Sequence, residues 1–200
     1  MLVGKRMSGK VVTLTSDDYL STAQSRMWSG KFRRLPVVQD ERLVGIITDR
    51  DLREHLGRLE RTRISEAMTE NPLTVTPETT LEEAAQTLLK NKIGGLPVIE
   101  LGKLVGIITT SDILQAFLDV MGVSVSGAAR IDLLLEGKRQ DFTSASKIIA
   151  EEGGEILGLG TYREKWGESH VCYLRLRTAD PERVTKALEE KGYNVLGVHP

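Results

Sequence analysis

The sequence predicts an α+β protein: two copies of a β-α-β-β-α unit, followed by a smaller β-α-β-β-α-β domain. The first observation is an internal repeat. When the chain is shifted by 61 residues, LPV at 35–37 falls on LPV at 96–98, and LVGIIT at 43–48 falls on LVGIIT at 104–109. The second is that short apolar runs alternate with stretches of helical spacing in both copies. The third is that no further copy of the phrase follows residue 121.

The strands of each copy are predicted from short apolar runs. VVTLT at 11–15 is a β-branched run typical of a strand. LPVV and LVGII are two further strands, and the polar QDER between them indicates a hairpin turn. Copy two repeats this hairpin around ELGK. Because each copy alone has only a small core to bury, we expect the two copies to pack together.

The helices are predicted from spacing and from end signals. Residues 16–30 and 111–122 place apolar side chains at helical intervals. In copy two, Thr76 is a suitable N-cap and Pro77 a suitable first helical residue for a helix that ends near Asn91.

The end of the repeated phrase supports two interpretations. Thr48 with Asp51, and Thr109 with Asp112, fit the Ser/Thr-x-x-Asp/Glu capping box, which is a structural role. A helix N-terminus also favours phosphate, a hydroxyl donates to a phosphate oxygen, and a carboxylate accepts from a ribose diol. A capped helix end can serve both purposes, so both interpretations stay open.

The doubled LPV…LVGIIT..D phrase resembles a tandem pair of CBS domains, the Bateman module, over about residues 1–121. The resemblance implies that the two units pair by pseudo-two-fold symmetry and leave two clefts. It implies that these clefts bind adenine nucleotides as regulatory ligands, with AMP or ATP favoured and NAD or S-adenosylmethionine as alternatives. No catalytic cofactor is expected, and the three histidines lie too far apart in the sequence to indicate a metal site. Carried over by position, Asp51 and Asp112 take ribose hydroxyls, and Thr48 and Thr109 approach phosphate. The remaining implied ligand-binding residues frame the base or flank each LPV: Thr13, Thr15, Thr74, Thr76, Arg34, Pro36, Gly95 and Pro97.

The two copies differ beside these positions. Copy one has Arg33-Arg34 before LPV and Arg50 between Thr48 and Asp51, where copy two has Gly94-Gly95 and Ser111. Arginine is a natural bidentate partner for phosphate, and glycines allow close backbone approach or a turn. We therefore expect unequal clefts, with the cleft containing Arg50 preferring the more charged ligand. The alternative is that these arginines are surface residues.

The last third of the chain has its own pattern. Its order, β-α-β-β-α-β, is the ferredoxin-like plan, with Asp180 as the N-cap of its second helix and Gly192 after that helix. On a regulatory chain this resembles an ACT domain, which implies homodimerisation and a second ligand site in the loop EGKRQDF. Candidate residues of that site are Gly137, Lys138, Arg139 and Asp141. The order CBS, CBS, ACT resembles the AcuB-type acetoin utilisation family, which implies a role near acetoin catabolism.

These observations give domain boundaries of 1–60 and 61–121 for the two CBS units, 122–127 for a linker and 128–200 for the ACT-like domain. No segment matches a nucleophile elbow or a Walker loop, so no enzyme is expected. His170 and Cys172 alternate on one strand, which fits a metal pair or, more commonly, packing.

Composition limits the partners. The formal net charge of -1 offers no long-range attraction to nucleic acid or anionic membrane. A single cysteine and the lack of a signal-peptide core or an apolar span favour the cytoplasm. The expected function is a nucleotide-responsive regulatory homodimer acting on an unidentified protein. The alternatives are a structural or interaction dimerisation module with vestigial clefts, and an unrecognised enzyme.

Overall fold

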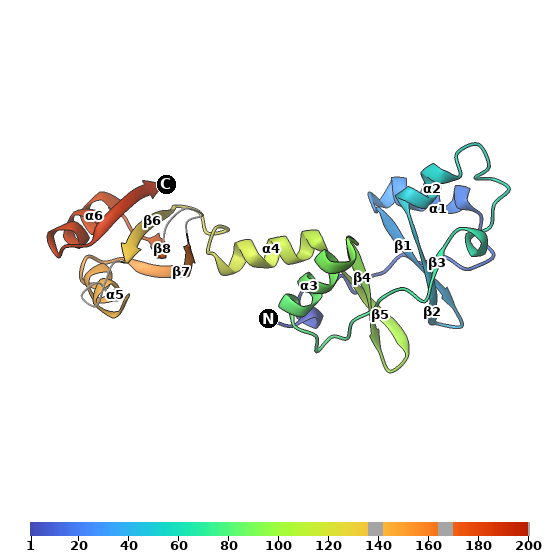
Figure 1. Ribbon diagram of the computed structural model, residues 1–200, viewed down its shortest axis with the longest axis horizontal. Coiled ribbons are helices and arrows are strands. Elements are labelled where there is room, and N and C mark those ends of the chain that lie inside the picture. The colour runs from blue at the N-terminus through green and yellow to red at the C-terminus, as the bar shows by residue number, and fades with distance from the viewer. Residues whose placement is uncertain (136–141, 164–169, 200) are drawn as a thin grey trace. The chain divides into compact units, whose positions relative to one another are not determined.

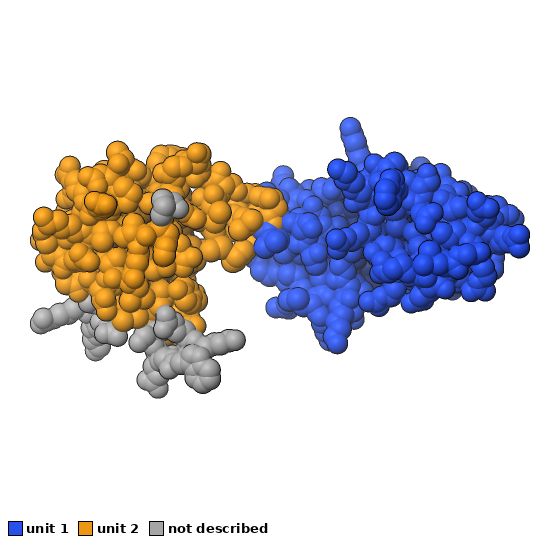
Figure 2. Space-filling model, turned by 90° about the horizontal axis from the view of Figure 1, so that it is seen from above, with its two compact units in different colours: residues 1–114 blue, residues 115–200 orange. Residues whose placement is uncertain are grey.

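The computed structural model describes residues 1–135, 142–163 and 170–199 (Figure 1). The chain divides into two compact units, Met1–Leu114 and Gln115–Pro200, which Figure 2 shows in different colours. Both copies of the repeat lie in the first unit, except for the last turns of helix α4 (Thr110–Val120).

The elements of the first unit recur in the two copies. Copy one contains η1 (Val3–Lys5), α1 (Leu20–Gly30), β1 (Arg34–Gln39), β2 (Arg42–Thr48) and α2 (Asp49–Glu54). Copy two contains η2 (Ile64–Glu66), β3 (Thr69–Glu70), α3 (Leu81–Asn91), β4 (Gly95–Glu100), β5 (Lys103–Thr109) and α4. The predicted hairpins are confirmed: β1 pairs antiparallel with β2, and β4 pairs antiparallel with β5. Their registers shift at equivalent places, after Val37 and after Val98, so the repeat extends to the bulges.

Two local predictions differ from the structure. The predicted strand at 11–15 is reduced to one bridge, in which the Leu14 N–H donates to the Pro36 carbonyl at 3.0 Å and the Leu14 carbonyl accepts from the Val38 N–H at 2.8 Å. The next residue leaves the strand direction because the Thr15 N–H donates to the Asp18 carboxylate at 2.8 Å, which closes a turn.

The N-cap of α3 is Thr80, not Thr76. The Thr80 hydroxyl accepts from the Glu83 N–H at 3.2 Å, and the Glu83 carboxylate accepts from the Thr80 N–H at 3.1 Å. Thr76 has Thr79 three residues later, and the Thr76 N–H donates to the Thr79 hydroxyl within a turn. Only the Thr80–Glu83 pair supplies the acid that a capping box requires, so the helix begins one turn later.

The leading segment of each copy packs against the other copy. The N-terminal segment joins copy two, because the Val3 N–H donates to the Thr79 carbonyl at 2.9 Å and Ser8 bridges Ile107 of β5. In exchange, β3 of copy two pairs with β2 of copy one.

This exchange carries apolar side chains into the opposite core. Ile64, from the start of copy two, is fully buried in the core of copy one with Leu14, Leu20 and Ile47. A Cβ placed on Gly106 would lie 2.5 Å from the Met7 sulfur, so that strand needs a glycine where the exchanged methionine crosses it. Neither copy is therefore complete without the other.

The second unit contains β6 (Ala128–Leu135), α5 (Phe142–Glu151), β7 (Glu155–Arg163), β8 (His170–Arg177), α6 (Pro181–Glu190) and β9 (Asn194–His199). Its strands are ordered β7-β8-β6-β9, and the pairs β7–β8, β8–β6 and β6–β9 are all antiparallel. Both helices pack on one face of this sheet through a buried core of Ile131, Leu133, Ala145, Ile149, Cys172, Leu174, Leu176, Val184, Leu188 and Tyr193 (Figure 1). The Asp180 cap is confirmed, since its carboxylate accepts from the Arg183 N–H at 3.0 Å.

Over the described ranges, no helix combines the length and the apolar character that crossing a membrane requires.

Candidate ligand-binding cavity

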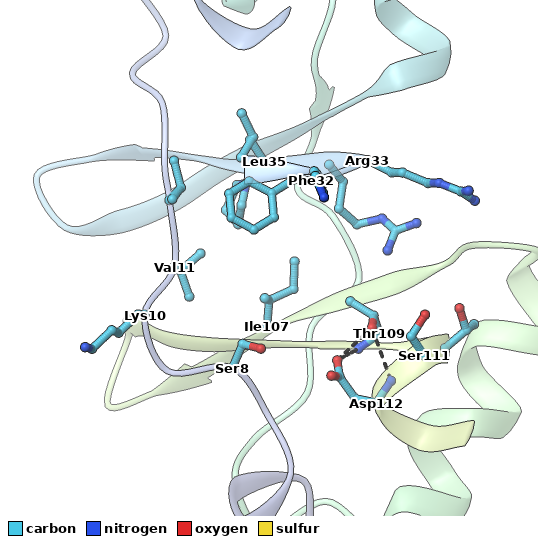
Figure 3. A pocket seen from close by; sticks show the side chains of 15 residues that line it. Ser8, Lys10, Val11, Phe32, Arg33, Leu35, Ile107, Thr109, Ser111 and Asp112 are labelled. Carbon is cyan, nitrogen blue, oxygen red and sulfur yellow. Dashed lines mark hydrogen bonds between the residues drawn. The ribbon is translucent and has the colours of Figure 1, made fainter. Parts of the chain in front are cut away.

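A cavity of about 430 Å³ lies between the two copies of the first unit (Figure 3). Its volume is within the range of small-molecule sites. Copy one supplies one wall from the end of α1 and the start of β1. Copy two supplies the other from the end of β5 and the start of α4. The lining residues are Ser8, Lys10, Val11, Val12, Lys31, Phe32, Arg33, Arg34, Leu35, Pro36, Ile107, Thr109, Thr110, Ser111 and Asp112.

One side of the cavity is apolar. Figure 3 shows Val11, Phe32, Leu35 and Ile107 gathered together. The end of α1 positions Phe32: Lys31 takes a left-handed conformation, with φ of 54°, and the Phe32 N–H donates back to the Met27 carbonyl at 2.9 Å. A flat aromatic ligand would find apolar contact here.

The other side is polar and is built on the first turn of α4. The Asp112 carboxylate oxygen Oδ2 accepts from the Thr109 N–H at 2.8 Å and from the Thr109 hydroxyl at 2.7 Å. Asp51 and Thr48 form the same pair in copy one, each bond being 2.7 Å long. The capping interpretation is therefore confirmed in both copies. Among the described residues, Asp112 Oδ1 has no hydrogen-bond partner, so it can accept from a ligand hydroxyl.

Four basic side chains line the cavity, namely Lys10, Lys31, Arg33 and Arg34. In the part of the chain that the structure describes, no carboxylate lies within 4.0 Å of their nitrogen atoms. Asp112 is the acidic residue of the lining. The cavity therefore carries excess positive charge, which favours an anionic ligand.

Arg34 is half-buried, and this burial is the main reason that its pKa is lowered from the usual value. The charge of Asp49 opposes that shift, while the like charge of Arg33 adds to it. The pKa of Asp49 is itself lowered, first by the hydrogen bond from Arg53 and more weakly by Arg33 and Arg34. An arginine stays charged despite such a shift, so the cavity holds a partly desolvated cation with no close carboxylate.

The structure brings some of the predicted site residues together and separates others. Arg34, Pro36, Thr109 and Asp112 line the cavity. Thr74 lines a smaller cavity of about 300 Å³ beside Arg42 and Asn71. The other candidates do not line the 430 Å³ cavity: Thr13, Thr15, Thr48, Arg50, Asp51, Thr76, Gly95 and Pro97. The candidates of the last domain, Gly137, Lys138, Arg139 and Asp141, lie outside the described residues.

The grouping of charges differs from the sequence-based expectation. Arg33 and Arg34 of copy one line the same cavity as Thr109, Ser111 and Asp112 of copy two, whereas Arg50 does not line it. Sequence reasoning also missed Lys10, Lys31 and Phe32. These residues lie at the C-terminal end of α1 and in the exchanged leading segment, and the packing between the two copies brings them to the cavity. The sequence pattern of either copy alone does not indicate that they line a cavity.

The two alternating residues on β8, His170 and Cys172, have different surroundings. Cys172 is buried in the core of the second unit, and its burial is the main reason that the pKa of its thiol is raised. His170 is exposed and accepts from the Arg163 Nε–H at 2.9 Å. Within the described residues, no group of three or more His, Cys, Asp or Glu side chains could hold a metal ion.

Comparison with known proteins relates this cavity to a family. A CBS domain-containing protein of Dictyostelium discoideum is 35% identical over 136 residues, covering 60% of this chain and 94% of the relative. The inosine-5'-monophosphate dehydrogenase of Staphylococcus haemolyticus is 31% identical over 97% of this chain. This chain spans only 43% of that enzyme's length.

Three solved structures are similar to part of this chain. CBSX2 in complex with AMP has a TM-score of 0.54 and 31% identity, over 58% of this chain and 96% of that chain. The CBS domain pair of MJ0100 in complex with 5'-methylthioadenosine and S-adenosyl-L-methionine has a TM-score of 0.55 and 30% identity, over 58% and 99%. An acetoin utilisation protein (AcuB) from Vibrio cholerae has a TM-score of 0.56 and 31% identity, over 62% and 94%.

The family model of the CBS domain matches residues 3–58 and 64–119. These two segments cover more than half of the 200 residues and coincide with the two copies of the repeat. The chain belongs to the CBS-domain family and carries a tandem CBS pair.

Proposed function

We propose that this chain is a non-enzymatic regulatory protein that binds an adenine nucleotide in the cavity between its two CBS copies. One observation carries the proposal: an apolar wall, a carboxylate with a free oxygen and four basic side chains surround a single cavity. The base would lie against Phe32 and Ile107, the ribose hydroxyls would donate to Asp112, and the phosphate would meet the basic side chains. The AMP and S-adenosylmethionine complexes of the similar CBS pairs support the adenosine part of this ligand.

Ligand-induced stabilisation tests the proposal directly. The full chain should be heated with AMP, ADP, ATP, NAD, S-adenosylmethionine and a panel of amino acids. A ligand at 100 times its Kd adds about 2.7 kcal/mol of stability. Each kcal/mol raises Tm by roughly 2–4 °C in a chain of this size. We expect AMP or ATP to raise Tm, with titration calorimetry confirming the binding. A panel without any shift or heat would refute nucleotide sensing.

We further propose that the second unit is an ACT-type module that forms the homodimer and transmits the ligand state to a metabolic partner in the cytoplasm. Its strand order and its two helices on one face support this assignment. Regulation of this kind requires that the ligand binds two states of the protein with different affinity. The similarity to AcuB favours a pathway near acetoin catabolism.

Removal of residues 123–200 tests the dimerisation role. These residues hold the sheet and helices of the second unit, whereas the cavity lies entirely within residues 1–114. We expect light scattering to show a smaller oligomer for the shortened chain than for the full chain. An unchanged oligomer size would place the dimer contact in the CBS pair.

A dimerisation module with vestigial clefts is the competing function. It is favoured by the capping boxes, because these already give Thr48, Asp51, Thr109 and Asp112 a structural role. The ligand panel distinguishes the two functions, because a protein with vestigial clefts should show no rise in Tm with any ligand.

A further inference from the structure

Gly94 and Gly95 occupy the positions that Arg33 and Arg34 hold in copy one. Neither glycine has a positive φ, so the backbone conformation does not require glycine at either position. Gly95 also begins strand β4, where glycine weakens pairing. A glycine in such a place commonly marks the close approach of another group.

The group that approaches is the Arg34 side chain. A Cβ on Gly94 would overlap the Arg34 guanidinium, and the three atoms nearest to that Cβ all belong to Arg34. A Cβ on Gly95 would lie 2.8 Å from Arg34 Nη1 and 2.9 Å from its Cδ. Arg34 Nη1 donates to the Gly94 carbonyl at 2.5 Å. The two glycines therefore form a seat for an arginine of the other copy.

The same carbonyl connects this seat to the cavity. The Gly94 oxygen also accepts from the Thr110 N–H at 3.2 Å, and Thr110 belongs to the first turn of α4 beside Asp112. The Gly94 carbonyl thus links Arg34 to the first turn of α4, which forms the polar side of the cavity. An arginine held in place before binding loses less side-chain entropy when it meets an anion.

We propose that Gly94 and Gly95 are positioning residues that hold Arg34 at the cavity wall, and that the seated Arg34 determines the specificity of the cavity for a charged nucleotide over an uncharged nucleoside. This inference rests on the proposed function. It also explains why the copies differ here: a side chain at either glycine position would displace the arginine.

The test compares the Kd of AMP and of adenosine by titration calorimetry in the full chain. Arg34→Ala should weaken AMP about 10- to 100-fold, the range of a charge-assisted hydrogen bond, and leave adenosine nearly unchanged. Gly94→Ala should weaken AMP about tenfold in the same selective way. In the Arg34→Ala background, Gly94→Ala should have no further effect. Gly9→Ala is the matched control, because its Cβ would meet only the Val105 carbonyl, at 3.9 Å.

The outcomes separate the inference from the function on which it rests. If the natural chain binds AMP but Gly94→Ala binds it equally well, the seat is refuted and the nucleotide site stands. Independent losses from Arg34→Ala and Gly94→Ala in the double variant would also refute it. If the natural chain binds none of the adenine nucleotides of the panel, the proposed function fails. The seat is then tested by the same double-mutant cycle on the Tm of the ligand-free chain, where additive effects would refute it.

Gly95→Ala is a second variant that disturbs the contact between the glycines and Arg34 while leaving Arg34 itself unchanged. Its Cβ also approaches the Ile108 carbonyl at 3.3 Å, so a loss of Tm is expected in addition to weaker AMP binding. Selective loss of AMP over adenosine in both glycine variants supports the seat. An equal loss of AMP and adenosine would indicate distortion of the cavity instead and would overturn the inference.

Discussion

Asp112→Ala should abolish most of the stabilisation that a nucleotide confers, whereas Asp51→Ala should leave it intact. The two carboxylates have the same local role, since each accepts two hydrogen bonds from the threonine three residues earlier. Only Asp112 lines the 430 Å³ cavity. In the proposed function its free oxygen accepts from a ribose hydroxyl, so its loss should weaken AMP binding about 10- to 100-fold.

The pairing of these variants separates capping from binding. Loss of the cap should destabilise each variant by about 1 kcal/mol. Both should therefore show a similar fall in Tm without ligand, and only Asp112→Ala should lose the rise in Tm with AMP. Calorimetric titration of both variants against AMP measures the difference. Normal AMP binding by Asp112→Ala would restrict this carboxylate to capping.

Ile64→Ala should destabilise the first unit by about 2–5 kcal/mol, the usual cost of truncating a buried isoleucine. Ile64 is fully buried in the core of copy one, although it belongs to the start of copy two. The cavity left behind is surrounded by residues of the other copy, so the loss acts on the contact that holds the copies together. Differential scanning calorimetry should show a lower Tm for the transition of the first unit.

Leu89→Ala is the control for this truncation. Leu89 lies on α3 with 77% of its surface exposed, so its removal should change stability by no more than about 0.5 kcal/mol. An Ile64→Ala variant that unfolds at the temperature of the Leu89→Ala variant would contradict the exchange of leading segments. Val3 is the equivalent buried residue in the other direction, and Val3→Ala should also lower Tm.

These two predictions depend on contacts of different range, and this range explains what sequence reasoning could and could not anticipate. The hairpins around residues 40 and 101, and the caps at Thr48, Thr109 and Asp180, involve partners only a few residues apart. The cap of α3 was misplaced by one turn, because Thr76 and Thr80 are both acceptable N-caps by residue type. The acid three residues later, Glu83, distinguishes them.

The repeat, the two hairpins and the Thr-Asp pair at each repeated helix start follow from the sequence alone. Three features are evident only in the tertiary structure: the exchange of leading segments, the cavity that Arg33 and Arg34 share with Asp112, and the close approach of Arg34 to Gly94 and Gly95. The physical reason is the difference between local and non-local contacts. Spacing along the chain specifies hydrogen bonds within a turn or a hairpin. The residues that line opposite walls of a cavity depend on how the two folded copies pack against each other. Arg34 and Gly94, for example, are 60 positions apart in the sequence and come into contact only through that packing.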